Sequence, residues 1–345
     1  MPRVSLVGGS LPRWGAGAVV AGAVVVIGGV LAILGSFNVV LLAALALAAS
    51  SVGIYAWARA VEGPRKATDR LVTIAVSSAF VIALVPLVSL LYTVASNGLV
   101  RFDLAFFTES MRGVVGEGGG IAHAITGTLL ITGLATAFSV PIGVMAAIYL
   151  HEYGRGRLRR ALTFFVDVMT GIPSIVAGLF AYALFVIFFG PGIRLGVMGA
   201  IALSVLMIPI VVRSTEEMLR VVPNGLREAA YALGVSKWRT IVKVVLPTSF
   251  VGIVSGVMLA VARIVGETAP LLVTTGVLTS TNTNPFDGRM QNLAVFAFNE
   301  YSNPGVPKDP YIDRAWGAAL TLIVIVMALS LVARLISNRY GTRTA

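Results

Sequence analysis

The sequence predicts an all-α, polytopic integral membrane protein with about eight transmembrane helices. Of its 345 residues, 57% are hydrophobic and only 12% are charged, and the mean hydropathy is +0.92. A soluble globule with an ordinary charged surface does not have this composition. The net charge of +11 resides mainly in short connections between long apolar runs, a pattern that reports membrane orientation rather than nucleic-acid binding.

The first two helices come from one uncharged stretch of 45 residues between Arg13 and Arg59. A helix rises about 1.5 Å per residue and a bilayer core needs about 20 residues, so this stretch crosses twice. The natural turn is Gly35-Ser36-Phe37-Asn38. Six further spans are predicted at about 71–95, 122–150, 161–189, 195–215, 246–278 and 315–337.

Lys and Arg residues are concentrated in every second connection, and this alternation predicts which side of the membrane each connection faces. The basic connections, predicted to be cytoplasmic, carry Arg59, Arg65, Lys66 and Arg70, then Arg155, Arg157, Arg159 and Arg160, then Arg213, Arg220, Arg227, Lys237, Arg239 and Lys243. Both termini are also predicted to be cytoplasmic, from Arg3, Arg13, Arg334, Arg339 and Arg343. The connections 96–121 and 279–314 carry more acidic residues and are predicted to be extracytoplasmic.

A short polar stretch between two apolar spans predicts two short helices joined by a turn. Four apolar residues recur at i, i+3, i+4 and i+7 and would share one face of the first helix: Leu226, Ala229, Ala230 and Leu233. Arg227 and Glu228 would lie on the other face. Asn224 is placed to cap the helix start, and Gly234 to end it in the left-handed conformation. A second short helix would begin at Ser236.

The most specific residues of this stretch are Glu228, Ala229, Ala230, Gly234, Leu246 and Pro247. In identity and spacing they resemble the EAA loop of ABC-importer permease subunits, with Val244 in place of the usual Ile. The resemblance implies that the loop at 224–247 binds a cytoplasmic ATPase, on the side that the charge pattern independently gives it. An ordinary amphipathic connector is the alternative interpretation.

Catalytic signatures are missing from the sequence. It has no Gly-x-x-x-x-Gly-Lys-Ser/Thr loop, no Gly-x-Ser-x-Gly elbow and no His-Glu-x-x-His pair. His123 and His151 fall at opposite ends of one predicted span, and cysteine is absent, so no metal site is predicted. We therefore expect that the chain is not an enzyme, that it holds no cofactor, and that ATP and Mg are bound by a partner ATPase.

Two charges interrupt the apolar span at 246–278. Arg263 and Glu267 are four residues apart and would share one face of a helix, continuing a line of small residues, Gly252, Gly256 and Ala260. Pro270 predicts a kink beside them. Because guanidinium binds oxyanions by paired hydrogen bonds, Arg263, Glu267 and the adjacent Thr268 are the candidate substrate-pathway residues. The alternative is a buried salt bridge that orders the bundle. Asp167 is a weaker candidate.

Three further phrases narrow the family: Ile148-Tyr149-Leu150-His151-Glu152-Tyr153-Gly154, Gly171-Ile172-Pro173-Ser174-Ile175-Val176-Ala177-Gly178 and Ala262-Arg263-Ile264-Val265-Gly266-Glu267-Thr268-Ala269-Pro270. With the Asn284 to Met290 stretch, they resemble phosphate-import permeases of the PstA type over about residues 70–340. The resemblance implies inorganic phosphate as substrate, a PstC-type second permease, a PstB-type cytoplasmic ATPase dimer and a PstS-type extracytoplasmic binding protein, at the bacterial cell membrane.

The chain departs from the six-helix permeases at its N-terminus. Residues 1–62 would form an extra pair of transmembrane helices, either packed on a partner or facing lipid, and residues 63–345 the permease core. Two alternative functions stay open: an ABC permease for another solute, such as sulfate, molybdate or an organic compound, and an ATP-independent anion transporter. Glu267 is expected to accept a hydrogen bond from protonated phosphate, which sulfate cannot donate.

Overall fold

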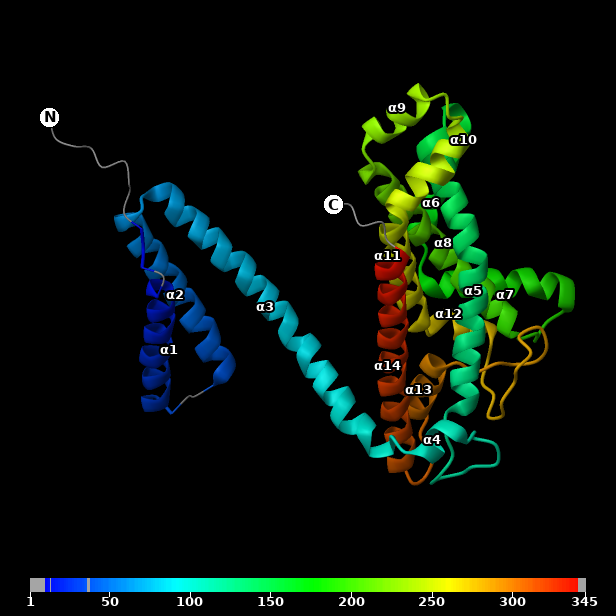
Figure 1. Cartoon of the computed structure of the whole chain (residues 1–345). Helices are drawn as coiled ribbons and strands as arrows, with labels where there is room; N and C mark the ends of the chain where they lie inside the picture. Colours follow the sequence, from blue (N-terminus) through cyan, green and yellow to red (C-terminus); the bar gives the residue numbers. More distant parts are fainter. Residues whose placement is uncertain (1–9, 13, 36–37, 341–345) are drawn as a thin grey trace. The chain divides into compact units, whose positions relative to one another are not determined.

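The structure is a computed structural model that describes residues 10–340 except 13, 36 and 37, and leaves the side chains of 336, 338 and 340 undescribed (Figure 1). Within these residues it contains helices and no strands. Seven described helices are long and apolar enough to cross a membrane, or eight spans if one bent pair counts as a single crossing. The all-α class and the number of spans are thus confirmed. Arg3, Arg13, Arg343 and part of the predicted first turn lie outside the described residues.

The chain divides into two compact units, residues 1–92 and 93–345, and each is described by itself. The first unit holds α1 (Gly15–Ile33), α2 (Val39–Val61) and most of α3 (Pro64–Gly98). Asn38 caps α2 by accepting hydrogen bonds from the backbone N–H groups of Val40 and Leu41. The predicted domain boundary at 62/63 falls between α2 and α3, and it stays a prediction.

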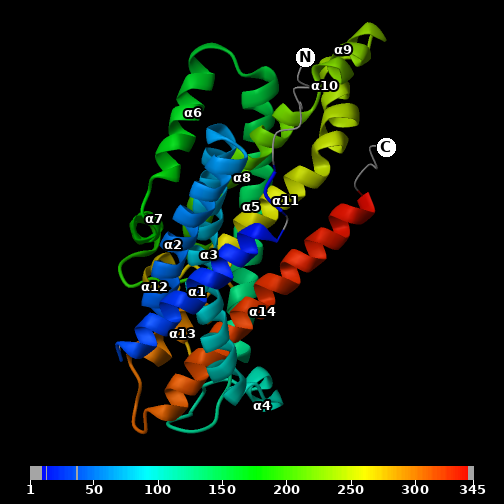
Figure 2. The ribbon, with the colours of Figure 1, turned by 90° about the vertical axis from the view of Figure 1, so that its left-hand side faces the viewer.

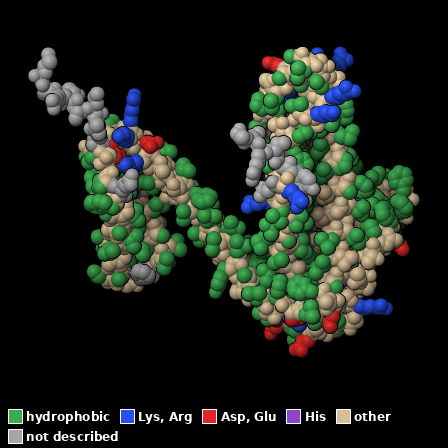
Figure 3. Space-filling view, in the orientation of Figure 1, with side chains coloured by type: hydrophobic (Ala, Val, Ile, Leu, Met, Phe, Trp, Pro, Cys, Tyr) green, Lys and Arg blue, Asp and Glu red, His purple; other side chains and the backbone are tan. Residues whose placement is uncertain are grey.

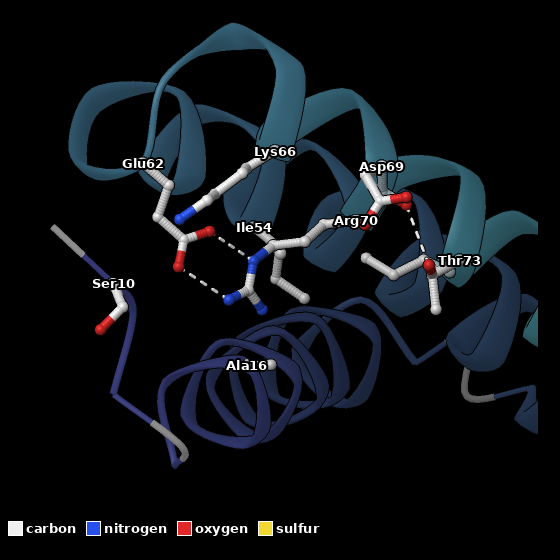
Figure 4. A pocket seen from close by; sticks show the side chains of 9 residues that line it. Ser10, Ala16, Ile54, Glu62, Lys66, Asp69, Arg70 and Thr73 are labelled. Atoms are coloured by element: carbon white, nitrogen blue, oxygen red, sulfur yellow. Dashed lines mark hydrogen bonds and ion pairs between the residues drawn. The ribbon is translucent and has the colours of Figure 1, made fainter. Parts of the chain in front are cut away.

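A bidentate ion pair ties α2 to α3 in this unit (Figure 4). The Nε and Nη2 atoms of Arg70 donate to the two carboxylate oxygens of Glu62 at 2.6 and 2.8 Å, and the backbone N–H of Leu11 donates to the same carboxylate at 2.6 Å. The hydrogen bond from Arg70 is the main cause that lowers the pKa of Glu62 to about 2. Lys66 and Asp69 line the adjoining pocket of about 630 Å³.

The second unit is a helical bundle around α8. Its helices are α4 (Leu104–Thr108), α5 (Ala122–Ile148), α6 (Gly156–Thr170), α7 (Ser174–Phe189), α8 (Gly196–Val221), α9 (Asn224–Ala232), α10 (Lys237–Thr240), α11 (Leu246–Val265), α12 (Ala269–Thr274), α13 (Leu293–Ser302) and α14 (Asp309–Tyr340). A 3₁₀ turn, η1 (Leu99–Arg101), precedes α4, and two π-helical turns, η2 (Tyr149–Tyr153) and η3 (Ile241–Val245), follow α5 and α10. α5, α7 and α11 pack against α8, and α14 packs against α11 and α13.

Small residues let α11 approach α8 closely, as their spacing predicts. A Cβ atom at Gly252 would lie 2.2 Å from the sulfur of Met218, and one at Gly256 would lie 2.5 Å from the side chain of Ser214. Ala260 continues this face and is fully buried. The line of small residues is therefore a helix-packing surface.

Two predicted spans are broken helices. The span 161–189 is α6 and α7, which meet at an angle of 110° around Gly171 to Pro173. The prediction of one continuous helix is wrong here because Pro173 has no N–H to donate to the preceding turn. The span 246–278 likewise ends as α11 at Val265 and resumes as the short α12 with Pro270 in its first turn. The kink predicted from Pro270 is confirmed, and it is a complete break.

The two ends of the second unit differ in charge. Figures 1 and 2 both show α9 and α10 at one end and α4 at the other. In Figure 3, Lys and Arg side chains gather near the end that carries α9 and α10, acidic side chains gather at the opposite end, and hydrophobic side chains cover the surface between. This distribution agrees with the alternation of basic and acidic connections in the sequence.

Candidate functional site

The loop at 224–247 begins with α9, whose ends are set by Pro223 and Gly234. Pro223, with φ of −61°, precedes the helix, and Asn224 is its first residue. The cap predicted for Asn224 is wrong: its Oδ1 accepts from Arg227 Nη1 at 3.2 Å rather than from a backbone N–H. Gly234 has φ of +74° as predicted, and N–H groups of 234 and 235 close a Schellman motif on the carbonyls of 231 and 230.

The faces of α9 are arranged differently from the predicted pattern. Arg227 and Ala230 are buried, whereas Leu226 and Ala229 are exposed and Leu233 keeps 83% of its surface exposed. Glu228 is also exposed, and so are the large side chains of Tyr231 and Trp238. Three of the four predicted apolar residues thus form a stripe that faces away from the chain, whereas the fourth, Ala230, packs against the chain. An exposed apolar stripe on a polar loop indicates a surface for another protein.

The side chain of Arg227 anchors α9 to the helical bundle. Its Nη2 and Nε atoms donate to Glu152 Oε1 at 3.0 and 3.2 Å, its Nη1 to the carbonyl of Val222 at 2.7 Å, and its Nη2 to the carbonyl of Leu219 at 2.9 Å. The carboxylate of Glu152, in η2, is almost fully buried. One guanidinium therefore joins the ends of α5 and α8 to the loop. Sequence reasoning missed this role, although Glu152 belongs to the family phrase at 148–154.

The second half of the loop leads directly into α11. α10 begins after Ser236 as predicted, and Lys237 Nζ donates to the carbonyl of Glu152 and lies 4.7 Å from the centre of the Tyr153 ring. The π-helical turn η3 follows, and Leu246 and Pro247 form the first turn of α11. The loop is therefore joined to η2, at the end of α5, through Glu152, and to α11 through the helical backbone.

The candidate pathway residues lie at the far end of α11. Arg263 is exposed on the same stripe as Ser255 and Leu259, and Glu267 and Thr268 lie half-buried in the break before α12. Because α11 ends at Val265, the prediction that Arg263 and Glu267 share a helix face is wrong. Among the described side chains neither forms an ion pair, so the buried salt bridge is not present.

Two of the family phrases meet beside this break. A Cβ atom at Gly178 of α7 would lie 2.6 Å from the Cα of Pro270 in α12. Only glycine allows the two backbones to approach this closely. The 171–178 phrase thus positions the break that carries Glu267 and Thr268. Asp167, the weaker candidate, instead pairs with Arg213 of α8 in a largely exposed ion pair.

Comparison with known proteins identifies the chain at the level of its family. The model of the family described as "Binding-protein-dependent transport system inner membrane component" matches residues 139–345. A Mycobacterium tuberculosis protein named "Phosphate transport system permease protein PstA 1" is 46% identical over 275 residues, which cover 79% of this chain and 88% of the relative. The chain belongs to this family and is a PstA-type permease. The Yersinia pestis PstA protein is 38% identical to this permease over 279 residues, covering 79% and 90% of the two chains.

Solved structures support the fold of this permease. A chain of the MetNI methionine ABC transporter superposes with a TM-score of 0.53 at 21% identity, covering 64% of the permease and 95% of that chain. A chain of a bacterial alginate ABC transporter superposes with a TM-score of 0.57 at 16% identity, covering 80% of the permease and 96% of that chain. At these identities the likeness concerns the fold, which is that of ABC transporter membrane subunits.

Proposed function

We propose that this chain is the permease subunit of an ATP-driven ABC importer that moves inorganic phosphate across the bacterial cytoplasmic membrane into the cell. The observation that carries the proposal is the identity of 38–46% to proteins named as phosphate transport permeases, over 79% of the chain. Arg263, held exposed in a membrane helix, supports an anionic substrate because guanidinium pairs well with oxyanions.

The partners follow from the proposed assembly: a PstC-type second permease, a PstB-type ATPase dimer and a PstS-type extracytoplasmic binding protein. The exposed apolar stripe of α9 supports a protein partner at the loop. ATP and Mg would be bound by that ATPase, with no cofactor in this chain and both termini in the cytoplasm. Arg263, unpaired among the described residues, would face a pore shared with the second permease.

The contacts of the loop suggest how ATP binding reaches the pathway. Closure of the ATPase dimer would shift α9, and the Arg227–Glu152 pair would pass the shift to α5. The same shift would reach α11 through α10 and η3, and so would move Arg263 and the break at Gly266 to Thr268. In this proposal α11 connects the coupling loop, at its N-terminal end, to the pathway residues, at its C-terminal end.

The experiment is uptake of radiolabelled phosphate by cells whose only phosphate importer is this permease with its partners. Wild type should give ATP-dependent, high-affinity uptake, and Arg263→Ala should lower it at least tenfold. Arg334→Ala, at an exposed arginine on the neighbouring α14, is the matched control and should be unaffected. Uptake of sulfate, molybdate or an organic solute in place of phosphate would contradict the substrate, and uptake without ATP would contradict the transporter class. Normal uptake by Arg263→Ala would remove the site assignment.

A further inference from the structure

Two loops meet at the C-terminal end of α12. The backbone N–H of Leu195 donates to the carbonyl of Thr274 at 3.2 Å, and that of Met290 donates to the carbonyl of Thr275 at 3.2 Å. The first loop joins α7 to α8, and the second joins α12 to α13; both lie away from α9 and α10 (Figure 1). Each donor directly follows an arginine, so the two bonds fix the backbone at Arg194 and Arg289.

The two arginine side chains converge over Gly276. This glycine has φ of +72°, and a Cβ atom built on it would lie 2.9 Å from Cδ of Arg194 and 3.4 Å from Cδ of Arg289. The two Cδ atoms are therefore no more than 6.3 Å apart, the largest separation that these two distances allow. A glycine leaves the space that both stems occupy, and its positive φ is strained for other residues.

This pair of cations has no carboxylate partner among the described residues. Neither arginine forms an ion pair, and Asp287, in the same loop as Arg289, forms none either. Arg194 Nη1 donates to the carbonyl of Leu272 at 2.9 Å. Through that bond Arg194 caps the C-terminal end of α12. The other N–H groups of Arg194, and all those of the Arg289 side chain, have no acceptor among the described residues.

With their Cδ atoms no more than 6.3 Å apart, the two side chains bring two positive charges to one place, where both can reach an anion that lies between them. Each can give an oxyanion two parallel hydrogen bonds. We propose that Arg194 and Arg289 form a capture site for the transported oxyanion at the extracytoplasmic mouth, where it is held before it passes α12 and reaches Arg263. The inference rests on the proposed function for the identity of the anion, and it adds a second, earlier contact to the pathway.

The test is the number of phosphate ions moved per ATP hydrolysed, measured with the complete transporter and its binding protein in proteoliposomes. Arg289→Gln should lower this ratio at least threefold, because anion released into the mouth escapes before translocation. ATP hydrolysis should stay within twofold of wild type, since the coupling loop is untouched. Arg289→Lys should restore much of the ratio by restoring the charge. Arg112→Gln, at an exposed arginine in the other predicted extracytoplasmic connection, is the control.

The Gly276→Ala variant tests the geometry independently. Its Cβ would displace Arg194, so it should lower the same ratio while both arginines remain in the sequence. If the wild type moves phosphate, and Arg289→Gln moves as many phosphate ions per ATP as the control Arg112→Gln, the capture site is wrong and the proposed function stands. If wild type moves no phosphate, the proposed function itself fails, and the capture site fails with it.

Discussion

The guanidinium of Arg227 lies 3.0 Å from the carboxylate of Glu152, and both side chains are buried where α9 meets the end of α5. They are 75 positions apart in the sequence. The pair fastens an otherwise exposed loop to the bundle, and carbonyls at the end of α8 accept hydrogen bonds from the same guanidinium. A loop that transmits motion needs such an anchor, since a flexible loop would absorb the displacement.

Arg227→Ala is expected to loosen the loop and to destabilise the bundle end. Removing one partner of a buried pair typically costs about 3–5 kcal/mol, because the other charge stays buried without compensation. The midpoint of thermal unfolding in detergent should fall, and phosphate uptake should fall with it. Arg239→Ala removes an exposed arginine of α10 and should leave the unfolding midpoint unchanged. Equal midpoints for the two variants would exclude the anchoring role.

Leu233→Asp is expected to weaken binding of the ATPase without destabilising the permease. The side chain is 83% exposed, so a carboxylate there meets water in the free subunit but enters an apolar contact in the complex. Co-purification of the ATPase with a tagged permease measures the effect, and we expect at least a tenfold loss. Leu158→Asp makes the same change at an exposed leucine of α6. Retention of the ATPase by Leu233→Asp would place the interface elsewhere.

The behaviour of α9 shows what could be predicted from sequence and what could not. The spacing of the four apolar residues from Leu226 to Leu233 correctly predicts a helix, because periodicity reports local geometry. It does not say what covers the stripe. Burial of Arg227 depends on Glu152, which is distant in the sequence, and no local pattern reports that contact. The helix is therefore predicted correctly, but the burial of Ala230 and the exposure of the other three apolar residues are not.

The broken helices show the same limit in the membrane. Apolar composition predicts where the chain lies in the bilayer, and it located the spans ending in α7 and α12. Composition is insensitive to direction, so it could not give the 110° bend before Ser174 or the end of α11 at Val265. Pro173 and Pro270 are the local signals for both breaks. Pro270 predicts a kink, and the structure shows that the helix stops there altogether.

Gly178→Ala is expected to disturb the break that carries the pathway residues. The new methyl group would meet the backbone of Pro270 at 2.6 Å, where no side-chain rotation relieves the contact. Overpacking of this kind costs about 1–3 kcal/mol. Gly133→Ala, in α5, is the matched control because a Cβ there meets nothing within 4 Å, and it should be neutral or slightly stabilising. A thermal unfolding midpoint for Gly178→Ala as high as that of the control would show that the contact relaxes freely.

The Glu62–Arg70 pair gives the first unit a defined dependence on pH. The pKa of Glu62 is lowered in the fold from its ordinary value of 4.5 to about 2. A lowered carboxyl pKa stabilises the fold fully above pH 4.5, and the contribution is lost as the pH falls towards 2. The difference in thermal midpoint between wild type and Glu62→Gln should therefore be constant from pH 7 to about 5 and shrink below that. A difference that persists undiminished at pH 2.5 would contradict the assignment.

Glu267→Gln should lower the preference for phosphate over sulfate. Glu267 lies half-buried in the break after α11, where its backbone N–H donates to the carbonyl of Ile264 at 3.2 Å and its carboxylate has no ion-pair partner among the described residues. A carboxylate only accepts hydrogen bonds, so it attracts a protonated phosphate oxygen and repels sulfate, which has no proton to donate. Glutamine removes the repulsion and offers a donor.

The expected change in the ratio of phosphate to sulfate uptake is about tenfold, which corresponds to about 1.4 kcal/mol, the scale of one hydrogen bond to a charged group. Competition of sulfate with radiolabelled phosphate measures it in the complete transporter. Glu117→Gln, at an exposed carboxylate outside the spans, is the control for net charge. If both variants keep the wild-type preference, discrimination resides upstream of this permease, because a binding protein that delivers only phosphate makes selection at Glu267 unnecessary.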